Sequence, residues 1–192
     1  MTEAETLSEF RAAGALLDGH FILSSGLRSA RYLQCARVLA DPARAARLVA
    51  ALIAKLPHDA SAVDAVVAPA MGGVIVGYEL ARQLGVESLF VERPQGVFEL
   101  RRGFTLMPGA RVLMVEDVVT TGLSSREAIV AIRAAGGDVV AGACLVDRSN
   151  GTADIGVPLT SLIAFDVPTY AADALPPELA ALPAVKPGSR AA

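Results

Sequence analysis

Two adjacent carboxylates, Glu116 and Asp117, separate an apolar run from a loop of small and hydroxyl-bearing residues. The run, Val112–Val115, has the length and composition of a parallel strand that is buried on both faces. The residues that follow the acids, Thr120–Gly122, allow a backbone to turn tightly around a ligand. The pattern therefore predicts a strand that ends in an acidic corner and a ligand-binding loop.

A helix is expected to begin directly after this loop. Ser124 and Glu127 have the S-x-x-E spacing of a capping box, which is typical of a helix N-terminus. Backbone N–H groups at such a terminus point outward, and the helix dipole favours an anion there. The alternative is an ordinary strand–turn–helix connection with solvated acids. Because acids, hydroxyl groups and a glycine coincide, we favour an anion-binding site.

The segment VLMVEDVVTTGLSS closely resembles the phosphoribosyl pyrophosphate motif of the type I phosphoribosyltransferases. The resemblance implies that Glu116 and Asp117 bind the ribose 2- and 3-hydroxyls, and that Asp117 is catalytic. It also implies a 5-phosphate loop made of Val118, Val119, Thr120, Thr121, Gly122, Leu123 and Ser124. The segment has neither the Gly-Lys-Ser/Thr of a Walker A loop nor the G-x-G-x-x-G pattern of a dinucleotide site.

Residues 19–35, GHFILSSGLRSARYLQC, predict a surface hairpin with strands at 21–23 and 32–33 when they are considered alone. The same segment resembles the N-terminal hood of orotate phosphoribosyltransferases, which covers the orotate ring. Family members that act on hypoxanthine, adenine or uracil lack this pattern. The resemblance therefore implies orotate as the accepting base.

The resemblance assigns four orotate contacts, namely Ser25 and Tyr32 in the hood, Thr120 in the phosphate loop, and Arg148. An isolated arginine in a turn is ordinarily a surface residue, but an Asp-Arg pair at this strand end implies that Arg148 binds the orotate carboxylate. Ser24 stands where many relatives carry a lysine that contacts substrate, so this position contributes no charge.

A second Gly-rich corner, Pro69–Gly73, lies between an apolar strand at 65–68 and an amphipathic helix at 74–84. A corner at the carboxyl end of a parallel strand is a candidate anion site, with tight strand–helix packing as the alternative. The resemblance implies a pyrophosphate loop in which Met71 and Gly72 contact the donor and the peptide bond between residues 70 and 71 is cis. Many relatives carry lysine in place of Gly72.

Residues 92–104 predict a long hairpin excursion of the kind that is often mobile and functional. From the residues alone, Arg101 and Arg102 could be a solvated pair. The resemblance implies a flexible loop that closes over the active site of the neighbouring subunit in a homodimer. Arg93 matches the loop arginine, as a catalytic and donor-binding residue, whereas the usual lysines and histidine are missing. Arg101 and Arg102 are our hypothesis for the catalytic charge that replaces them.

Bulk composition limits the other possibilities. The chain has 192 residues, 53% hydrophobic and 19% charged, which is typical of one globular domain. Its net charge of −3 and lack of tryptophan argue against a nucleic-acid partner, and its apolar runs are too short or interrupted for a membrane span. Of 17 basic residues, only Lys55 and Lys186 are lysines. The N-terminus has no apolar signal core, and the two cysteines, Cys35 and Cys144, are far apart in the sequence. Both features indicate a cytoplasmic protein with buried thiols.

The element order predicts an α/β fold with a parallel sheet flanked by helices and a small N-terminal hood. We expect a single domain composed of a hood at about 1–36, a core at about 37–167 and a Pro-rich tail at 168–192 that holds at most a short helix. Helices are expected at 3–17, 42–56, 74–84, 124–135 and 177–182, with further strands at 88–91, 139–146 and 159–165.

The resemblance implies transfer of ribose 5-phosphate from phosphoribosyl pyrophosphate to orotate, a step of pyrimidine synthesis. Mg²⁺ would be bound mainly by the pyrophosphate and ribose oxygens, so we assign it no protein ligands. Three alternatives remain open: a phosphoribosyltransferase for another base, a non-catalytic regulator that senses phosphoribosyl pyrophosphate, and a phosphoacceptor receiver domain. The hood argues against the first, the lack of a nucleic-acid-binding segment against the second, and the placement of the lysines against the third.

Overall fold

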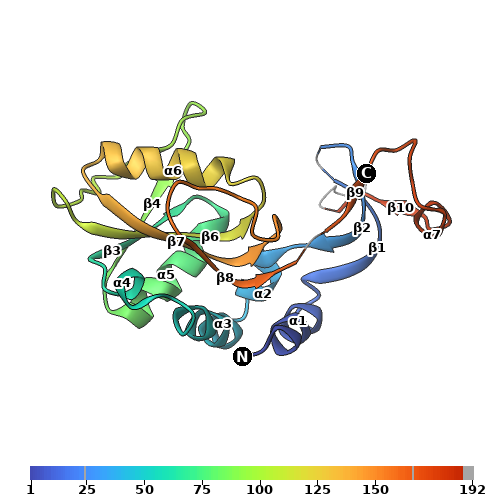
Figure 1. Cartoon of the computed structure of the whole chain (residues 1–192), viewed down its shortest axis with the longest axis horizontal. Helices are drawn as coiled ribbons and strands as arrows, with labels where there is room; N and C mark the ends of the chain where they lie inside the picture. Colours follow the sequence, from blue (N-terminus) through green and yellow to red (C-terminus); the bar gives the residue numbers. More distant parts are fainter. Residues whose placement is uncertain (24, 166, 188–192) are drawn as a thin grey trace.

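A six-stranded sheet and a four-stranded sheet form the framework of the protein (Figure 1). The computed structural model describes residues 1–23, 25–165 and 167–187. The large sheet has the order β5-β4-β3-β6-β7-β8, with β3 (Ala65–Pro69), β4 (Glu87–Glu92), β5 (Glu99–Leu100), β6 (Arg111–Val119), β7 (Asp138–Asp147) and β8 (Leu159–Ala164). All its neighbours pair in parallel except β4 and β5, which form the predicted hairpin.

Helices cover both faces of the large sheet, as the element order predicts. In Figure 1, α6 lies on one face, and α5 and α3 lie on the other. The helices are α1 (Glu3–Ala12), α2 (Cys35–Leu39), α3 (Pro42–Ile53), α4 (His58–Ser61), α5 (Gly72–Leu84), α6 (Leu123–Ala134) and α7 (Pro177–Ala180). Among the described residues, no helix is long and apolar enough to cross a membrane.

The central strands are buried on both faces, which explains their lack of polar alternation. Side chains of β6 alternate between two hydrophobic clusters, one on each side of the sheet. Leu113 and Val115 join the cluster under α3 and α5, whereas Val112 and Met114 join the cluster under α6. The prediction of a doubly covered parallel sheet is confirmed.

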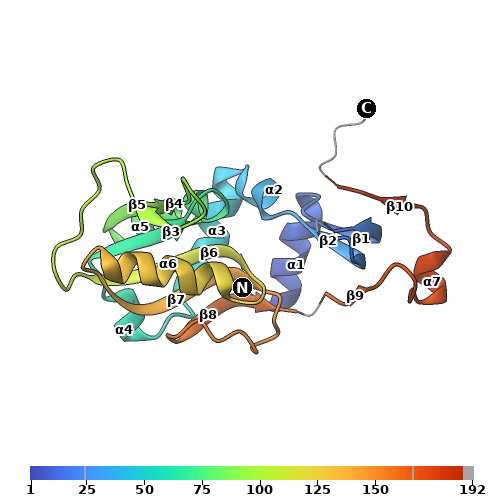
Figure 2. The same ribbon diagram turned by 90° about the horizontal axis from the view of Figure 1, so that it is seen from above.

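The small sheet forms the hood at one end of the molecule, with α7 at its outer edge (Figures 1 and 2). Its order is β10-β1-β2-β9, with β1 (Leu16–Ile22), β2 (Arg28–Leu33), β9 (Thr169–Tyr170) and β10 (Ala184–Val185). The sequence predicted the short helix of the tail, but it did not predict β9 and β10. These two-residue strands exist because β2 and β1 offer them backbone partners from the opposite end of the chain.

The helix predicted at residues 3–17 is too long, because α1 ends at Ala12 and residues 16–17 begin β1. Gly14 adopts the left-handed conformation with φ 60°, and the N–H of Ala15 donates to the carbonyl oxygen of Phe10 at 2.8 Å. A glycine in this conformation just past a helix satisfies the last carbonyl groups and redirects the chain.

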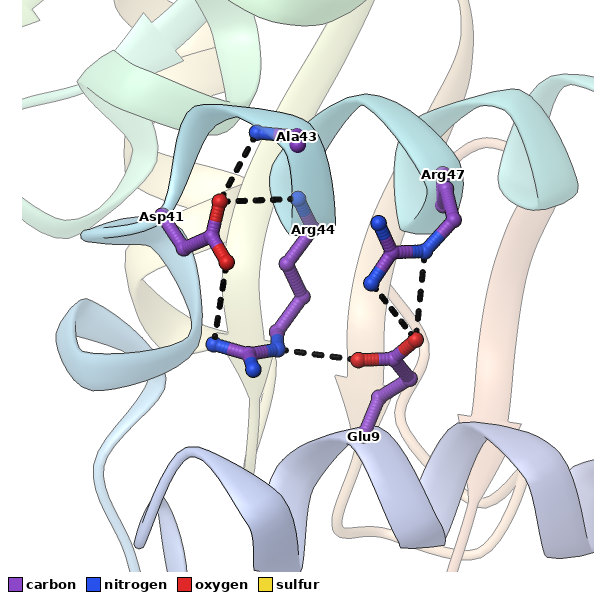
Figure 3. A network of polar contacts seen from close by, with 5 residues as sticks. All are labelled: Glu9, Asp41, Ala43, Arg44 and Arg47. Atoms are coloured by element: carbon purple, nitrogen blue, oxygen red, sulfur yellow. Dashed lines mark hydrogen bonds and ion pairs between the residues drawn. The ribbon is translucent and has the colours of Figure 1, made fainter.

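A charged network joins the first helix to the core (Figure 3). The Glu9 carboxylate accepts hydrogen bonds from the Nε of Arg44 at 2.9 Å and from the Nη2 of Arg47 at 2.7 Å. Asp41, the predicted N-cap of α3, accepts from the backbone N–H of Ala43 at 3.0 Å and pairs with Arg44. Arg47 and Arg44 lower the pKa of Glu9 below its ordinary value of 4.5.

Glu9→Gln is expected to destabilise the protein by about 1 kcal/mol at pH 7, because both arginines lose a charged acceptor. Since the pKa of Glu9 is lowered by folding, its contribution is present above 4.5 and is lost as the pH falls. Urea unfolding at pH 7 and pH 3.5 measures the difference. Glu3→Gln, on the exposed face of the same helix, is the control. An equal difference at both pH values would contradict the electrostatic account.

Candidate active site

A cavity of about 370 Å³ lies at the carboxyl ends of β3 and β6, where the two predicted corners meet. It is lined by Pro69, Ala70, Gly72, Gly73, Phe98, Glu116, Asp117, Val118, Thr120, Thr121, Gly122, Leu123 and Ser124. The carboxyl ends of parallel strands are the usual ligand site of this kind of sheet. We refer to this space as the donor cavity.

The two acids lie on β6 itself and not in a turn behind it. The strand was predicted to end at Val115 but continues to Val119, because β7 also extends and pairs with it as far as Asp147. Adjacent strand residues point to opposite faces, so Glu116 and Asp117 are aimed in different directions. The acidic corner of the sequence analysis is therefore the last part of a buried strand.

Both carboxyl groups are partly deprived of water. Burial, together with the nearby negative charge of Asp117, raises the pKa of Glu116 to about 7. Within the described chain, the Oε1 atom of Glu116 has no hydrogen-bond partner. Burial also raises the pKa of Asp117. A ligand that supplies hydroxyl donors or positive charge would stabilise the charged form of such carboxyl groups.

Gly72 permits the close approach of α5 to the second acid. A Cβ atom at position 72 would lie 2.6 Å from the Oδ1 of Asp117, so a larger residue there would require the Asp117 side chain to move. Gly72 lines the donor cavity as predicted, and the Ala70–Met71 peptide bond is cis as predicted. The Met71 side chain is 84% exposed and is absent from the lining of the donor cavity, so its donor contact stays a prediction.

The N-terminus of α6 forms one wall of the donor cavity, but not through the predicted capping box. Gly122 is the N-cap, in the left-handed conformation with φ 72°, and no side chain caps the helix. Ser124 and Glu127 instead interact with Arg93, whose Nη2 donates to the Ser124 hydroxyl at 3.1 Å and forms an ion pair with Glu127. The N–H groups of the first turn, which have no acceptor within the helix, lie beside the cavity.

Arg93, the first residue after β4, contacts two residues that line the donor cavity, Ser124 and Phe98. Its guanidinium lies 4.0 Å from the ring centre of Phe98, a cavity-lining residue that the sequence analysis missed. Arg102 binds Glu92 through two hydrogen bonds, of 2.9 and 2.7 Å. The lining of the donor cavity includes none of Arg93, Arg101 and Arg102. The catalytic and donor-binding role of Arg93 and the catalytic role of the other two arginines therefore stay predictions.

Arg126 is a second residue that the sequence analysis missed. Its Nη1 atom donates to the carbonyl oxygens of Thr121, at 3.2 Å, and Asp154, at 2.5 Å. The side chain thereby joins the phosphate loop to the segment before β8. Val119, the remaining residue of the predicted loop, is 1% exposed and only its backbone can take part in binding.

A second cavity, of about 710 Å³, lies between the hood and the end of the large sheet. It contains all four predicted orotate contacts and is lined by Ile22, Leu23, Ser25, Leu27, Arg31, Tyr32, Leu33, Thr120, Thr121, Arg148, Val167, Thr169, Lys186 and Pro187. We refer to it as the hood cavity. Because Thr120 and Thr121 line both cavities, the two spaces adjoin at the phosphate loop.

Arg148 is held at the hood cavity by the end of β7. Its backbone N–H donates to the carbonyl oxygen of Val119 at 2.8 Å. The preceding carboxylate, Asp147, is buried and accepts from the Ser149 hydroxyl at 2.6 Å and from the N–H groups of Ser149 and Gly151, both at 2.8 Å. A carboxylate satisfied in this way fixes the turn that follows the arginine.

Residues 37–166 match the family model described as the phosphoribosyl transferase domain. The chain therefore belongs to the phosphoribosyltransferase family.

Full-length relatives define the branch of that family. An orotate phosphoribosyltransferase from Rhizorhabdus wittichii is 68% identical over 193 residues, which cover 100% of this chain and 98% of the relative. Another, from Novosphingobium aromaticivorans, is 68% identical over 192 residues, with 100% and 99% covered. The crystal structure of orotate phosphoribosyltransferase from Aeropyrum pernix is similar with a TM-score of 0.72 and 28% identity, covering 82% of this chain and 92% of that one. The chain is thus grouped with the orotate phosphoribosyltransferases.

Glu116→Gln is expected to stabilise the empty protein at pH 8 by up to roughly 3 kcal/mol, and to have little effect near pH 4.5. The pKa of Glu116 is raised by folding, so its contribution is present below 4.5 and is lost as the pH rises through about 7. The neutral amide avoids burying that charge. Unfolding midpoints of both proteins from pH 4.5 to 8 measure the effect, with exposed Glu99→Gln as the control. A constant difference across this range would show that Glu116 is not a buried acid of raised pKa.

Proposed function

We propose that the protein is an orotate phosphoribosyltransferase, which converts orotate and phosphoribosyl pyrophosphate to orotidine 5-monophosphate and pyrophosphate. The observation that carries the proposal is the junction of the two cavities at Thr120 and Thr121. The donor cavity offers acids and a helix N-terminus, as a phosphorylated sugar requires. The adjoining hood cavity offers Arg148 for a carboxylated ring. The names of the full-length relatives support the same substrates.

The residues of the site act mainly by positioning and electrostatics. As the bond between the anomeric carbon of ribose and pyrophosphate breaks, positive charge builds on the sugar. A ring nitrogen of orotate then forms the new bond and loses its proton to the departing pyrophosphate or to water. Glu116 and Asp117 accept hydrogen bonds from the ribose hydroxyls. The backbone N–H groups and hydroxyls from Val118 to Ser124 hold the 5-phosphate. Thr120 and Arg148 orient the orotate ring beside the anomeric carbon.

Mg²⁺ belongs to this proposal as a cofactor. Among the described residues, no cluster of three or more histidine, cysteine or acidic side chains could hold a metal ion. We assign the ion mostly to substrate oxygens, because Mg²⁺ retains water and phosphate ligands. Glu116 and Asp117 would hold it through the ribose hydroxyls, and the ion would neutralise the charge of the departing pyrophosphate.

We also propose that the protein works as a homodimer in the cytoplasm. Helix α5 and its N-cap carry a stripe of exposed apolar side chains at helical spacing: Met71, the N-cap, is 84% exposed, and Ile75 and Tyr78 are 49% and 63% exposed. An apolar stripe next to a site suits a subunit interface. The 92–104 loop would then reach the neighbouring active site. The two cysteines are free, buried thiols, which fits a reducing compartment.

An absorbance assay with orotate, phosphoribosyl pyrophosphate and Mg²⁺ tests the function, with uracil, adenine and hypoxanthine as competing bases. We expect turnover of orotate alone. Asp117→Asn should lower kcat/KM for the donor by at least about tenfold, because it removes a charged acceptor for the ribose. Asp138→Asn, at the opposite end of the sheet, should have no effect. Turnover of another base would favour a different transferase, and donor binding without any turnover would favour a regulator.

Tyr78→Asp tests the interface, because an added charge in a buried apolar contact opposes association. Analytical ultracentrifugation should show a dimer for the unchanged protein and monomers for Tyr78→Asp. Val130→Asp places the same charge on α6, where Val130 is 66% exposed outside the stripe, and should leave the dimer intact. Dissociation of both variants, or of neither, would show that the α5 stripe is not the interface.

A further inference from the structure

The C-terminal segment delivers a lysine to the hood cavity. The segment turns back along the hood at Leu182, whose carbonyl oxygen lies 3.1 Å from the Nδ1 of His20. Strand β10 then pairs in parallel with β1, placing Ala184 beside His20 and Val185 beside Phe21. Lys186 is the next residue, and it lines the hood cavity together with Arg148 and Thr120. Its position is therefore fixed by the backbone pairing of the strand before it.

Lysine is scarce in this protein, which makes its placement informative. The other lysine, Lys55, donates from its Nζ to the carbonyl oxygen of Leu162 at 2.5 Å and so joins the segment after α3 to β8. Lys186 lines the hood cavity, whereas Lys55 lines neither the hood cavity nor the donor cavity. Three cationic side chains line the hood cavity: Arg148 from the end of β7, Lys186 from the tail, and Arg31 from β2, which is paired with Asp18.

The walls of the hood cavity fit a flat ring with a negative substituent. Tyr32 lies within 5.6 Å of Phe21, centre to centre, and Ile22, Leu27 and Leu33 add apolar surface. Such walls bind the faces of a ring through burial of apolar area. A carboxylate on that ring must exchange its water for charged donors. Arg31 is already paired with Asp18 at 3.3 Å, and Arg148 alone leaves part of the hydration of the carboxylate uncompensated. Lysine adds a compact point charge that the planar guanidinium does not provide.

We propose that Lys186 binds the carboxylate of the base in the hood cavity together with Arg148, so that the C-terminal strand takes part in base recognition. This inference rests on the proposed function. It makes Lys186 a substrate-binding residue that selects a carboxylated ring over a neutral one. It also gives β10 a role beyond closing the hood sheet, because its pairing with β1 positions the charge.

Steady-state kinetics of the full chain test the proposal. Lys186→Met keeps most of the length of the side chain and removes its charge. We expect the KM for orotate to rise at least about tenfold while the KM for phosphoribosyl pyrophosphate changes less than about twofold. The inhibition constant of orotate methyl ester, which has no carboxylate charge, should change less than about twofold. Lys186→Arg should recover part of the loss.

Val185→Ala is the matched control, because Val185 is 52% exposed in the same strand and lies outside the cavity lining. Its kinetics and melting temperature should match those of the unchanged protein. The proposal is overturned if Lys186→Met and Lys186→Arg both keep the original KM for orotate, or if the methyl ester loses affinity equally. A rise confined to the KM for the donor would also overturn it. If the unchanged protein does not turn over orotate, that result contradicts the proposed function itself, and this inference, which rests on it, is then also contradicted.

Discussion

The protein places two carboxyl groups at the buried end of its central strand, and the site depends on this arrangement. Glu116 is 6% exposed, and burial raises the pKa of both Glu116 and Asp117. Buried acids of raised pKa lower the stability of the empty protein at neutral and higher pH. The surrounding packing must therefore compensate for them. A ligand that offers hydroxyl donors at this strand end restores the interactions that the carboxyl groups lost on folding.

Close backbone packing around the acids provides that support. A Cβ atom at Gly73 would lie 2.9 Å from the carbonyl oxygen of Val115, and one at Gly77 would lie 2.9 Å from the Cβ of Ala68. Helix α5 can therefore lie directly against β3 and β6, so that Gly72 approaches Asp117. On the other side of the cavity, Arg126 and the left-handed Gly122 hold the phosphate loop. The donor site is thus set by rigid elements on both sides, as a site that works by positioning needs.

The hood is built differently, because it combines segments that are distant in the chain. Residues 16–33 provide its central hairpin, and β9 and β10 add the edges from the C-terminal segment. The Glu9 network joins α1 to α3, and Ser29 donates to the carbonyl oxygen of Pro168 at 3.1 Å. These contacts are few and partly exposed compared with the core. The hood cavity therefore depends on long-range pairing that brings Arg148, Tyr32 and Lys186 around one space.

The sequence by itself determined the parallel core and the donor site, because both depend on short segments with strong local signals. The apolar strands, the acid pair, the glycines at 72 and 122 and the Asp-Arg pair at 147–148 all occupy positions consistent with those expectations. Only the tertiary structure decided the extent of β6, the partners of Ser124 and Glu127, and the placement of Phe98, Arg126 and Lys186. In each case a contact from a distant segment outweighed a weak local preference. A two-residue strand such as β10 has almost no local signal, since its partner lies more than 160 residues away.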